Sequence, residues 1–358
     1  MSRDPSRRVK IALDAMGGDF GPAATVPGAL LAAQRGGVEV LLVGDADAVQ
    51  EELSRHVLDG LPVTVVPSEG VIGEGEAPIQ ALRQKPRASV VVGTSLVKEG
   101  KADAMVTMGS TGAAMAASSM LLGLLDGIER PALGGPIIGF APNMMFMELG
   151  ANLDCRPGQL VDFAALGVAF AQVHLKVPQP RVALLSVGAE SGKGNRQTRE
   201  AAEAFAQSGL NFIGNVEGHD LVAGLADVVV CDGFVGNILM KTMEGIGEVL
   251  SAHLRGRLRD LLPEAELEAL SREVLGLFSL VEDVGGGPLF GVRGLIVVGH
   301  GRASAQSVAS AIETARYSSD VGLLGHMEDE LRRLRARTNA ESPGANAYAG
   351  PGDTGRAR

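Results

Sequence analysis

The chain has 358 residues with a formal charge of −10, 46% hydrophobic residues, 49 glycines, 10 Phe, 2 Tyr and no Trp. This acidic, aromatic-poor composition excludes a nucleic-acid platform, which needs basic surfaces or stacking rings. The high glycine content has no Gly-X-Y period and, together with the apolar residues, predicts a globular, turn-rich α/β protein. The two cysteines, Cys155 and Cys231, are too few for a disulfide framework or a multi-cysteine zinc site.

The ends of the chain are poor in residues that could form a core. The charged N-terminus leads directly into an apolar run without a signal-like segment, and no uncharged apolar stretch of about 18 residues follows. We therefore expect a cytoplasmic protein. Residues 1–8 and 339–358 are expected to be disordered tails, and residues 9–338 are expected to form a single α/β domain.

Short apolar runs alternate with helix-length segments along the chain. The predicted strands, in order, are Lys10–Asp14, Val38–Val43, Val63–Val66, Ala104–Met108, Ile137–Phe140, Met144–Leu149, Arg181–Val187, Phe212–Asn215, Val228–Cys231 and Leu295–Val298. The main predicted helices are Ala23–Arg35, Ala113–Leu125, Gln159–His174, Gln197–Ser208, Asn237–Arg259 and Ser304–Ser318. This alternation predicts a doubly wound, mainly parallel sheet with helices on both faces.

Five of the predicted strands end in a glycine-rich polar turn that opens a helix. The turns are DAMGGDFGP (14–22), MGSTGA (108–113), SVGAESGKGN (186–195), CDGFVGN (231–237) and GHGRAS (299–304). Because the carboxyl ends of parallel strands share one edge of a sheet, we expect the five turns to meet in one crevice. Backbone amides at glycines and at helix N-termini would make this crevice an anion site, and phosphate is the expected anion.

The turns match no named nucleotide motif. GAESGKGN lacks the spacing and the Ser or Thr of a Walker A loop, and GHGRAS has Ser where the dinucleotide fingerprint has Gly. There is no G-x-S-x-G elbow and no metal-ligand spacing. Cys231, beside Asp232, and Cys155 are both expected to be small buried side chains rather than nucleophiles.

Polar side chains in the turns are the candidates for binding and catalysis. Lys193 lies among glycines and could reach a phosphate, although a solvated loop lysine is the alternative. His300 stands between two glycines and could donate to an oxyanion or simply close its turn. The remaining candidates, Asp14, Asp232, Asn195 and Asn237, could equally be helix caps.

Several longer segments of the chain resemble one family. These are IALDAMGGDFGP, EAPIQALRQK, SLVKEGKADAMVTMGSTGA, ERPALGGPI, ELGANLDCRP, GKGN, NFIGNVEGHD, DVVVCDGFVGNILMKTMEG, and GGGPLFG followed by GHGRA. In this order, from about Val9 to about Thr314, they resemble the PlsX family, the phosphate acyltransferases of bacterial phospholipid synthesis.

The resemblance implies a reaction, a fold and partners. The family transfers a long-chain acyl group from acyl carrier protein to inorganic phosphate, and a membrane glycerol-3-phosphate acyltransferase uses the acyl phosphate. The implied fold is that of phosphate acetyltransferases and isocitrate dehydrogenase-like enzymes. Members are homodimers that associate with the membrane surface. Phosphate can attack a thioester directly, so neither a protein nucleophile nor a cofactor or metal is expected.

The turns and the resemblance together define the expected site. The expected catalytic residues are Lys193, Asn237 and His300. The residues expected to bind phosphate or substrate are Asp14, Gly17, Gly18, Ser110, Thr111, Gly112, Asn152, Gly194, Asn195, Asp232 and Gly233. Three positions depart from the family pattern: Ser110 replaces Asn, Arg302 replaces Ser and Glu148 replaces Asp.

Residues 251–283 are expected to form a helical hairpin inserted in the domain. Leucines recur at helical spacing from Leu254 to Phe278 around a break at Pro263. The hairpin could pack in a dimer interface or, as in the family, touch lipid. Its acidic residues outnumber its arginines, so weak, mainly hydrophobic membrane contact is expected. Acyl carrier protein is acidic and is expected to dock on a local basic cluster, formed by Arg83, Lys85 and Arg87 or by Arg255, Arg257 and Arg259.

Two other functions fit part of this pattern. A phosphate acetyltransferase acting on acyl-CoA would use a similar cleft. A membrane-surface scaffold for lipid enzymes would explain the hairpin but not the five glycine turns. An NAD-linked dehydrogenase is disfavoured, because its fingerprint and its metal-binding aspartates are absent.

Overall fold

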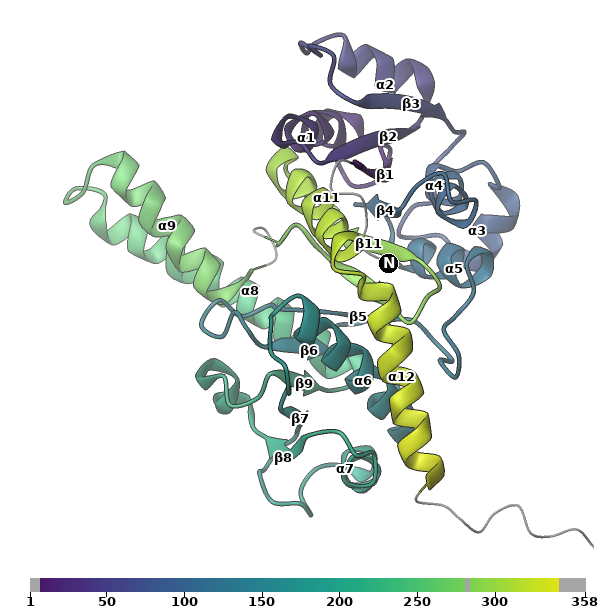
Figure 1. Cartoon of the computed structure of the whole chain (residues 1–358). Helices are drawn as coiled ribbons and strands as arrows, with labels where there is room; N and C mark the ends of the chain where they lie inside the picture. The colour runs from purple at the N-terminus through teal and green to yellow at the C-terminus, as the bar shows by residue number, and fades with distance from the viewer. Residues whose placement is uncertain (1–6, 281–283, 341–358) are drawn as a thin grey trace, which may run out of the picture.

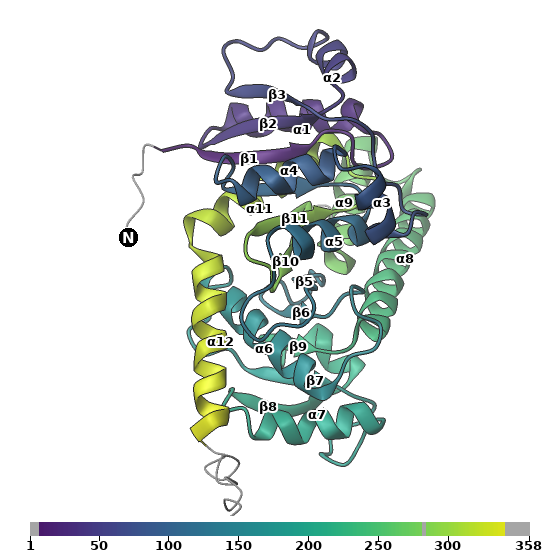
Figure 2. The same cartoon turned by 90° about the vertical axis from the view of Figure 1, so that its right-hand side faces the viewer.

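The computed structural model describes residues 7–280 and 284–340, in which eleven strands form one twisted sheet with helices on both sides (Figures 1 and 2). The strands are β1 (Val9–Asp14), β2 (Val38–Gly44), β3 (Val63–Pro67), β4 (Ala104–Thr107), β5 (Ala132–Gly135), β6 (Met145–Met147), β7 (Val182–Leu185), β8 (Phe212–Val216), β9 (Val228–Val230), β10 (Gly286–Phe290) and β11 (Leu295–Gly299). The helices are α1 (Pro22–Arg35), α2 (Ala46–Leu53), α3 (Pro78–Gln84), α4 (Ser89–Lys98), α5 (Thr111–Leu121), α6 (Pro157–Val173), α7 (Arg196–Ala206), α8 (Gly233–Leu258), α9 (Glu264–Phe278), α11 (Ala305–Asp320) and α12 (Leu323–Ala340), with a 3₁₀ turn η1 (Gly218–Ala223). The predicted α/β class is confirmed.

Alternate residues of the strands enter different cores on the two faces of the sheet. In β1, Ile11 and Leu13 join the core under α1 and α11, whereas Ala12 joins the core under α4 and α5. In β9, Val228 packs toward α6 and Val229 belongs to a third core on the other face, where α8 begins. The near-continuous apolar strands are therefore explained by burial on both faces.

The strand order is β3-β2-β1-β4-β11-β10-β5-β6-β9-β7-β8. Because β10 runs against both β11 and β5, and β5 runs against β6, strands β6 to β9 run opposite to β1, β4 and β11. The prediction that all five glycine turns share one edge is therefore wrong. The turns after β7 and β9 leave from the edge opposite to the turns after β1, β4 and β11.

The predicted strand Ile137–Phe140 is also wrong, and β5 and β10 were not predicted. The N–H of Gly139 donates to the carbonyl of Leu277, and the N–H of Leu280 donates to Ile137, so this segment supports α9 rather than joining the sheet. The missed strands have the sequences ALGG and GGPLF, whose glycines and proline gave no strand signal.

The predicted hairpin exists but is longer than residues 251–283. Its first helix, α8, already begins at Gly233, directly after β9, and α8 and α9 together project from the body (Figure 1). Leu267 and Val274 are buried between the two helices, whereas Val249 and Leu261 are exposed. The last residues of the prediction, 281–283, lie outside the described residues.

The predicted tails lie mostly outside the described residues. Of the predicted tail residues that the structure describes, Arg7 forms an ion pair with Asp103 at 2.8 Å, and the last two residues of α12, which ends at Ala340, belong to the predicted C-terminal tail. No helix in the described parts of the chain is long and apolar enough to cross a membrane.

Candidate functional site

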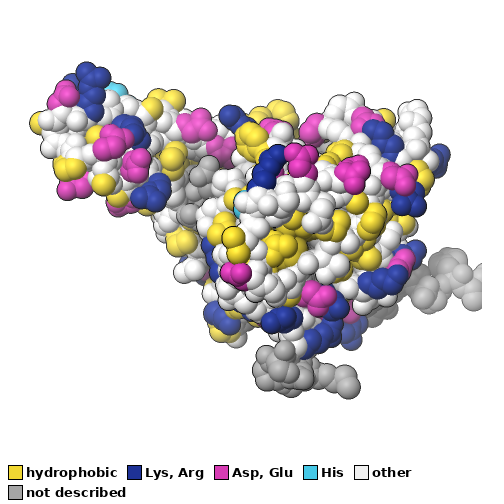
Figure 3. Space-filling view, turned by 90° about the horizontal axis from the view of Figure 1, so that it is seen from above, with side chains coloured by type: hydrophobic (Ala, Val, Ile, Leu, Met, Phe, Trp, Pro, Cys, Tyr) yellow, Lys and Arg dark blue, Asp and Glu magenta, His cyan; other side chains and the backbone are white. Residues whose placement is uncertain are grey.

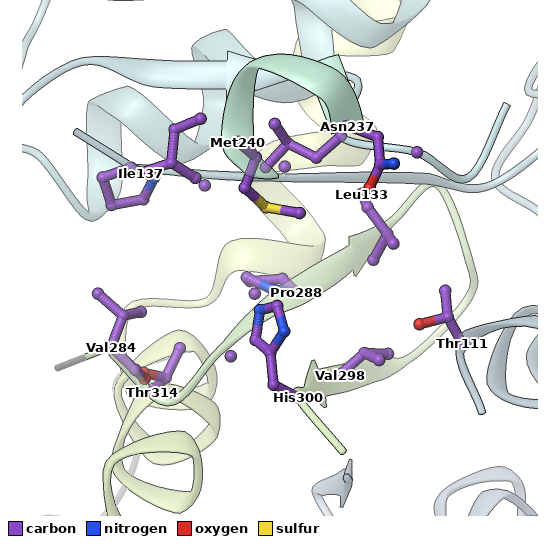
Figure 4. A pocket seen from close by; sticks show the side chains of 18 of the residues that line it. Thr111, Leu133, Ile137, Asn237, Met240, Val284, Pro288, Val298, His300 and Thr314 are labelled. Atoms are coloured by element: carbon purple, nitrogen blue, oxygen red, sulfur yellow. The ribbon is translucent and has the colours of Figure 1, made fainter. Parts of the chain in front are cut away.

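A cavity of about 460 Å³ opens at the edge where β4, β5 and β11 end (Figure 4). Its polar residues come from segments far apart in the sequence: Thr111 begins α5, His300 follows β11, and Asn237 and Lys241 lie in the first turns of α8. Helix α8 therefore carries residues from the opposite half of the sheet to this edge. The turns after β4 and β11 line the cavity directly, and the turn after β9 contributes to it through the first residues of α8.

The turn between β4 and α5 presents a helix N-terminus to the cavity. Gly109 and Thr111 line the cavity, and the hydroxyl of Ser110 caps α5 by accepting the N–H of Ala113 at 3.3 Å. The cap holds the turn while Thr111 keeps its hydroxyl free to face the cavity (Figure 4). The first amides of α5 and its positive dipole end favour an anion here.

Asp14 supports this turn from beneath rather than facing the cavity. Its carboxylate is 2% exposed and accepts the hydroxyl of Thr107 at 2.8 Å, and the Thr107 hydroxyl in turn accepts the N–H of Gly109 at 2.9 Å. Burial raises the pKa of Asp14. Gly17 allows this close approach, because a Cβ there would lie 2.8 Å from the N of Gly109. Gly18 packs in the same way against Gly301.

His300 points into the cavity between its two glycines, below Pro288 (Figure 4). Burial lowers its pKa, and the positive charge of Lys241 lowers it further, whereas Glu244 acts in the opposite direction. The imidazole is therefore held neutral at physiological pH, in which form one ring nitrogen can donate a hydrogen bond to a developing oxyanion.

Lys241 also lines the cavity, its charge acts on His300, and the sequence did not single it out as a site residue. It lies four residues after Asn237, which places the two side chains on one face of α8. Its side chain is 53% exposed and its Nζ pairs with Glu244 at 2.7 Å. The signal was present in the sequence, because a lysine one helical turn after a candidate residue shares its face. Glu74 is the acidic residue among the lining side chains.

Glu148 and Asn152 tie the walls of the cavity together. The buried carboxylate of Glu148 accepts the N–H groups of Leu133, Ala151 and Asn152, at 2.9, 2.9 and 2.5 Å. Asn152 accepts the N–H of Gly233 at 2.8 Å through its carbonyl and donates its amide to Pro131 at 2.8 Å. Asn152 and Gly233 thus position the start of α8, and neither residue lines the cavity.

The turn after β7 lies away from the cavity. Lys193 is exposed and is not among the lining residues. Asn195 caps α7 by accepting the N–H of Thr198 at 2.8 Å, and Gly194 has a φ of 104° beside it. Asp232 likewise caps α8, accepting the N–H of Val235 at 2.9 Å. The helix-cap alternative therefore describes Asn195 and Asp232 in this structure.

Three of the predicted site residues, Thr111, Asn237 and His300, line the cavity together. Ser110 and Gly112 lie in the same turn as Thr111, with Gly112 packed beside Pro78. Both cysteines are buried as expected; burial raises the pKa of the Cys155 thiol to about 12 and also raises that of Cys231. Among the described residues no group of three or more His, Cys, Asp or Glu could hold a metal ion.

His174, which lines the cavity from the C-terminal end of α6, is held neutral at physiological pH and makes stability sensitive to acid. Its ring stacks on Phe170 at 4.2 Å, and the hydroxyl of Ser318 lies 3.0 Å from its Nε2. Burial, followed by the charge of Lys176, lowers the pKa of His174 to about 4. The unfolded chain binds this proton below about pH 6.5 and the folded chain does not, so the free energy of unfolding falls between about pH 6.5 and 4.

Between pH 7 and pH 4, we predict that the free energy of unfolding of His174→Gln falls by about 3 kcal/mol less than that of the wild type. Urea unfolding of the variant and the wild type at both pH values measures this difference. His326→Gln, at an exposed histidine of α12, is the matched control and should behave as the wild type. Equal losses in all three proteins would contradict the prediction.

The comparisons with known proteins agree with this fold. The profile of a family described as "Fatty acid synthesis protein" matches residues 9–323. The chain is 41% identical over 329 residues to the phosphate acyltransferase of Desulforamulus reducens, covering 90% of this chain and 97% of that protein. It is 44% identical over 311 residues to that of Nitratidesulfovibrio vulgaris, covering 85% and 90%.

Solved structures share the architecture at low identity. A phosphotransacetylase from Streptococcus pyogenes matches with a TM-score of 0.60 and 18% identity, covering 88% of this chain and 94% of that one. A branched-chain phosphotransacylase from Enterococcus faecalis gives 0.55 and 14%, covering 87% and 99%. The protein is thus an α/β enzyme with the phosphotransacetylase fold. The chain belongs to the phosphate acyltransferase family and is a transferase, which confirms the resemblance seen in the sequence.

Proposed function

We propose that the chain transfers a long-chain fatty acyl group from the thioester of acyl carrier protein to inorganic phosphate, and that acyl phosphate is the product. The observation that carries this proposal is the cavity in which the N-terminus of α5, Lys241, Asn237 and the neutral His300 face an apolar interior. Such a site binds an anion beside an uncharged chain, which matches a phosphate and a fatty acyl group.

In this proposal the reaction needs no covalent intermediate with the protein. A phosphate oxygen, held by the Ser110–Gly112 turn and Lys241, attacks the thioester carbonyl carbon and forms a new C–O bond. Asn237 and His300 donate hydrogen bonds to the oxyanion of the tetrahedral intermediate. The C–S bond then breaks, and the carrier sulfur leaves as a thiolate that takes up a proton.

Lys193 remains a second proposed phosphate ligand. It lies among the glycines of GKGN just before α7, with Asn195 close by as the cap of that helix. In the structure Lys241, and not Lys193, lines the cavity with the other candidates. Separate substitution of the two lysines distinguishes these roles.

The test is incubation of the enzyme with phosphate and either hexadecanoyl acyl carrier protein or acetyl-CoA. We expect acyl phosphate, detected as its hydroxamate, from the long-chain carrier and at most a trace from acetyl-CoA. Preference for acetyl-CoA would replace the proposal with the phosphate acetyltransferase alternative. Absence of product from both would favour the scaffold alternative.

We also propose the partners and location that follow from this reaction. The protein is a homodimer in the cytoplasm and makes a weak hydrophobic contact with the membrane through residues 254–278. A downstream glycerol-3-phosphate acyltransferase uses its product. The projecting hairpin carries charges of both signs (Figure 3), and Leu261 near its tip is exposed, which supports weak lipid contact.

Acyl carrier protein would need a local basic surface on this acidic enzyme. In the first cluster, Lys85 and Arg87 are already paired with Glu76 and Glu69. In the second, at the hairpin tip, Arg255 pairs with Glu264 and Arg259 with Asp260. Because these pairs reduce the net charge of both clusters, exposed Arg83 and Arg257 are the residues in each that we propose for docking.

A further inference from the structure

The cavity has an apolar interior beyond its polar residues. Its apolar walls are formed by side chains from β5, β10, β11, α6 and α8 and from the segments beside them, and by the backbone of several glycines. The apolar side chains include Leu133, Ile137, Phe170, Met240, Val284 and Pro288. Figure 4 shows Met240 and Ile137 facing Val284 across the space below α8. His174 also lines this interior, and because its pKa is lowered to about 4 it adds no charge there at physiological pH.

Gly135 faces unfilled space in this interior. The residue is buried at the end of β5, where its backbone pairs with Phe146 of β6. A Cβ added at Gly135 would meet no atom within 4 Å, although protein interiors are close-packed. Its φ lies outside the left-handed region, so backbone conformation does not require a glycine here.

The neighbouring glycines have a different explanation. A Cβ at Gly134 would overlap the sulfur of Met147, and one at Gly299 would overlap the sulfur of Met108. At Gly287 it would lie 2.6 Å from the carbonyl of Gly134. Packing therefore excludes side chains at these three positions. A side chain at Gly135 would instead extend into the empty space of the cavity.

We propose that the apolar interior is the chamber that holds the acyl chain, and that the absence of a side chain at Gly135 determines how long a chain it accepts. The proposal rests on the proposed function, because that function supplies the acyl group. Burial of each methylene changes affinity about fourfold. A side chain that takes the place of several methylenes should therefore discriminate strongly against long chains.

The test is Gly135→Leu, with Gly158→Leu as the matched control. Gly158 also has no atom within 4 Å of an added Cβ, but it is exposed in the first turn of α6. We expect Gly135→Leu to lower the ratio of kcat/KM for hexadecanoyl to that for butyryl acyl carrier protein at least tenfold, with the control unchanged. Met240→Ala, which enlarges the chamber, should shift the preference toward longer chains.

A binding measurement separates this proposal from the proposed function. The fluorescent fatty acid cis-parinaric acid should bind the wild type and Gly158→Leu, and Gly135→Leu should weaken its binding at least tenfold. Gly135→Ala provides a smaller change if the leucine variant does not fold, as judged by its melting temperature. If folded Gly135 variants keep the wild-type chain preference and the wild-type affinity for the probe, the acyl-chain chamber proposal is overturned. If the wild type binds the probe but makes no acyl phosphate, only the proposed function is overturned.

Discussion

Replacing Lys241 by methionine is expected to lower kcat/KM for acyl phosphate formation by about 10²- to 10³-fold, the loss typical of removing one donor from a preorganised oxyanion or phosphate site. Methionine keeps the apolar stem of this cavity-lining side chain and removes the ammonium, whose charge acts on His300. Because the ammonium is assigned to phosphate, the KM for phosphate should rise while the KM for acyl carrier protein changes little. Initial rates at varied phosphate concentration measure this separation.

The matched control is Lys193→Ala, since the sequence alone predicts that this lysine is essential. Near-normal activity of Lys193→Ala together with loss in Lys241→Met would assign the phosphate cation to α8. The reverse result would assign it to the turn after β7 and would contradict the assignment of Lys241. Lys241→Arg should restore part of the activity, because a guanidinium also binds phosphate.

A second readout of Lys241→Met does not depend on turnover. Lys241 lowers the pKa of His300, so its removal should raise the pKa of this imidazole. Glu244, which loses its partner in the variant, acts in the same direction. Histidine C–H resonances followed by NMR through a pH titration would detect the shift, and Lys193→Ala should leave the His300 curve in place.

Most of the fold could be predicted from the sequence because the sheet is buried on both faces. The run Val228–Cys231 is wholly apolar and Val38–Val43 is apolar apart from Glu39, and both end in turn residues, which is a strong local signal. Strand direction carries no such local signal. The reversal at β10 and β5 depends on two short glycine-rich strands in the middle of the sheet, which are stabilised by their neighbours rather than by their own β-propensity.

The same reversal explains which parts of the site could be predicted. The turns after β4 and β11 meet as expected, because those strands are parallel neighbours. The turn after β9 starts from the other edge, so its cap residues stay away and residues one and two turns into α8, Asn237 and Lys241, reach the cavity. The turn after β7 has no such helix crossing to the cavity, which leaves Lys193 exposed.

Glu148→Ala is expected to lower the free energy of unfolding by about 3–5 kcal/mol, because it leaves one buried and two partly buried N–H groups without an acceptor. The Glu148 carboxylate links β5 to the segment after β6, because it accepts the N–H of Leu133 in β5 and those of Ala151 and Asn152 in that segment. Asn152 in turn holds the first N–H of α8, so the loss should also displace Asn237 and reduce activity in the molecules that remain folded.

The ionisation of Glu148 should make the free energy of unfolding depend on pH. Burial raises the pKa of Glu148 above its ordinary value of 4.5, despite the three donors. The folded chain therefore binds this proton at higher pH than the unfolded chain, and the stability it contributes decreases as pH rises from 4.5 through the folded pKa. Glu148→Gln, which cannot ionise, should lack this decrease while remaining more stable than Glu148→Ala. Urea unfolding at pH 4.5 and pH 7 measures both effects, and a Glu148→Ala variant within about 1 kcal/mol of the wild type would contradict the assigned role.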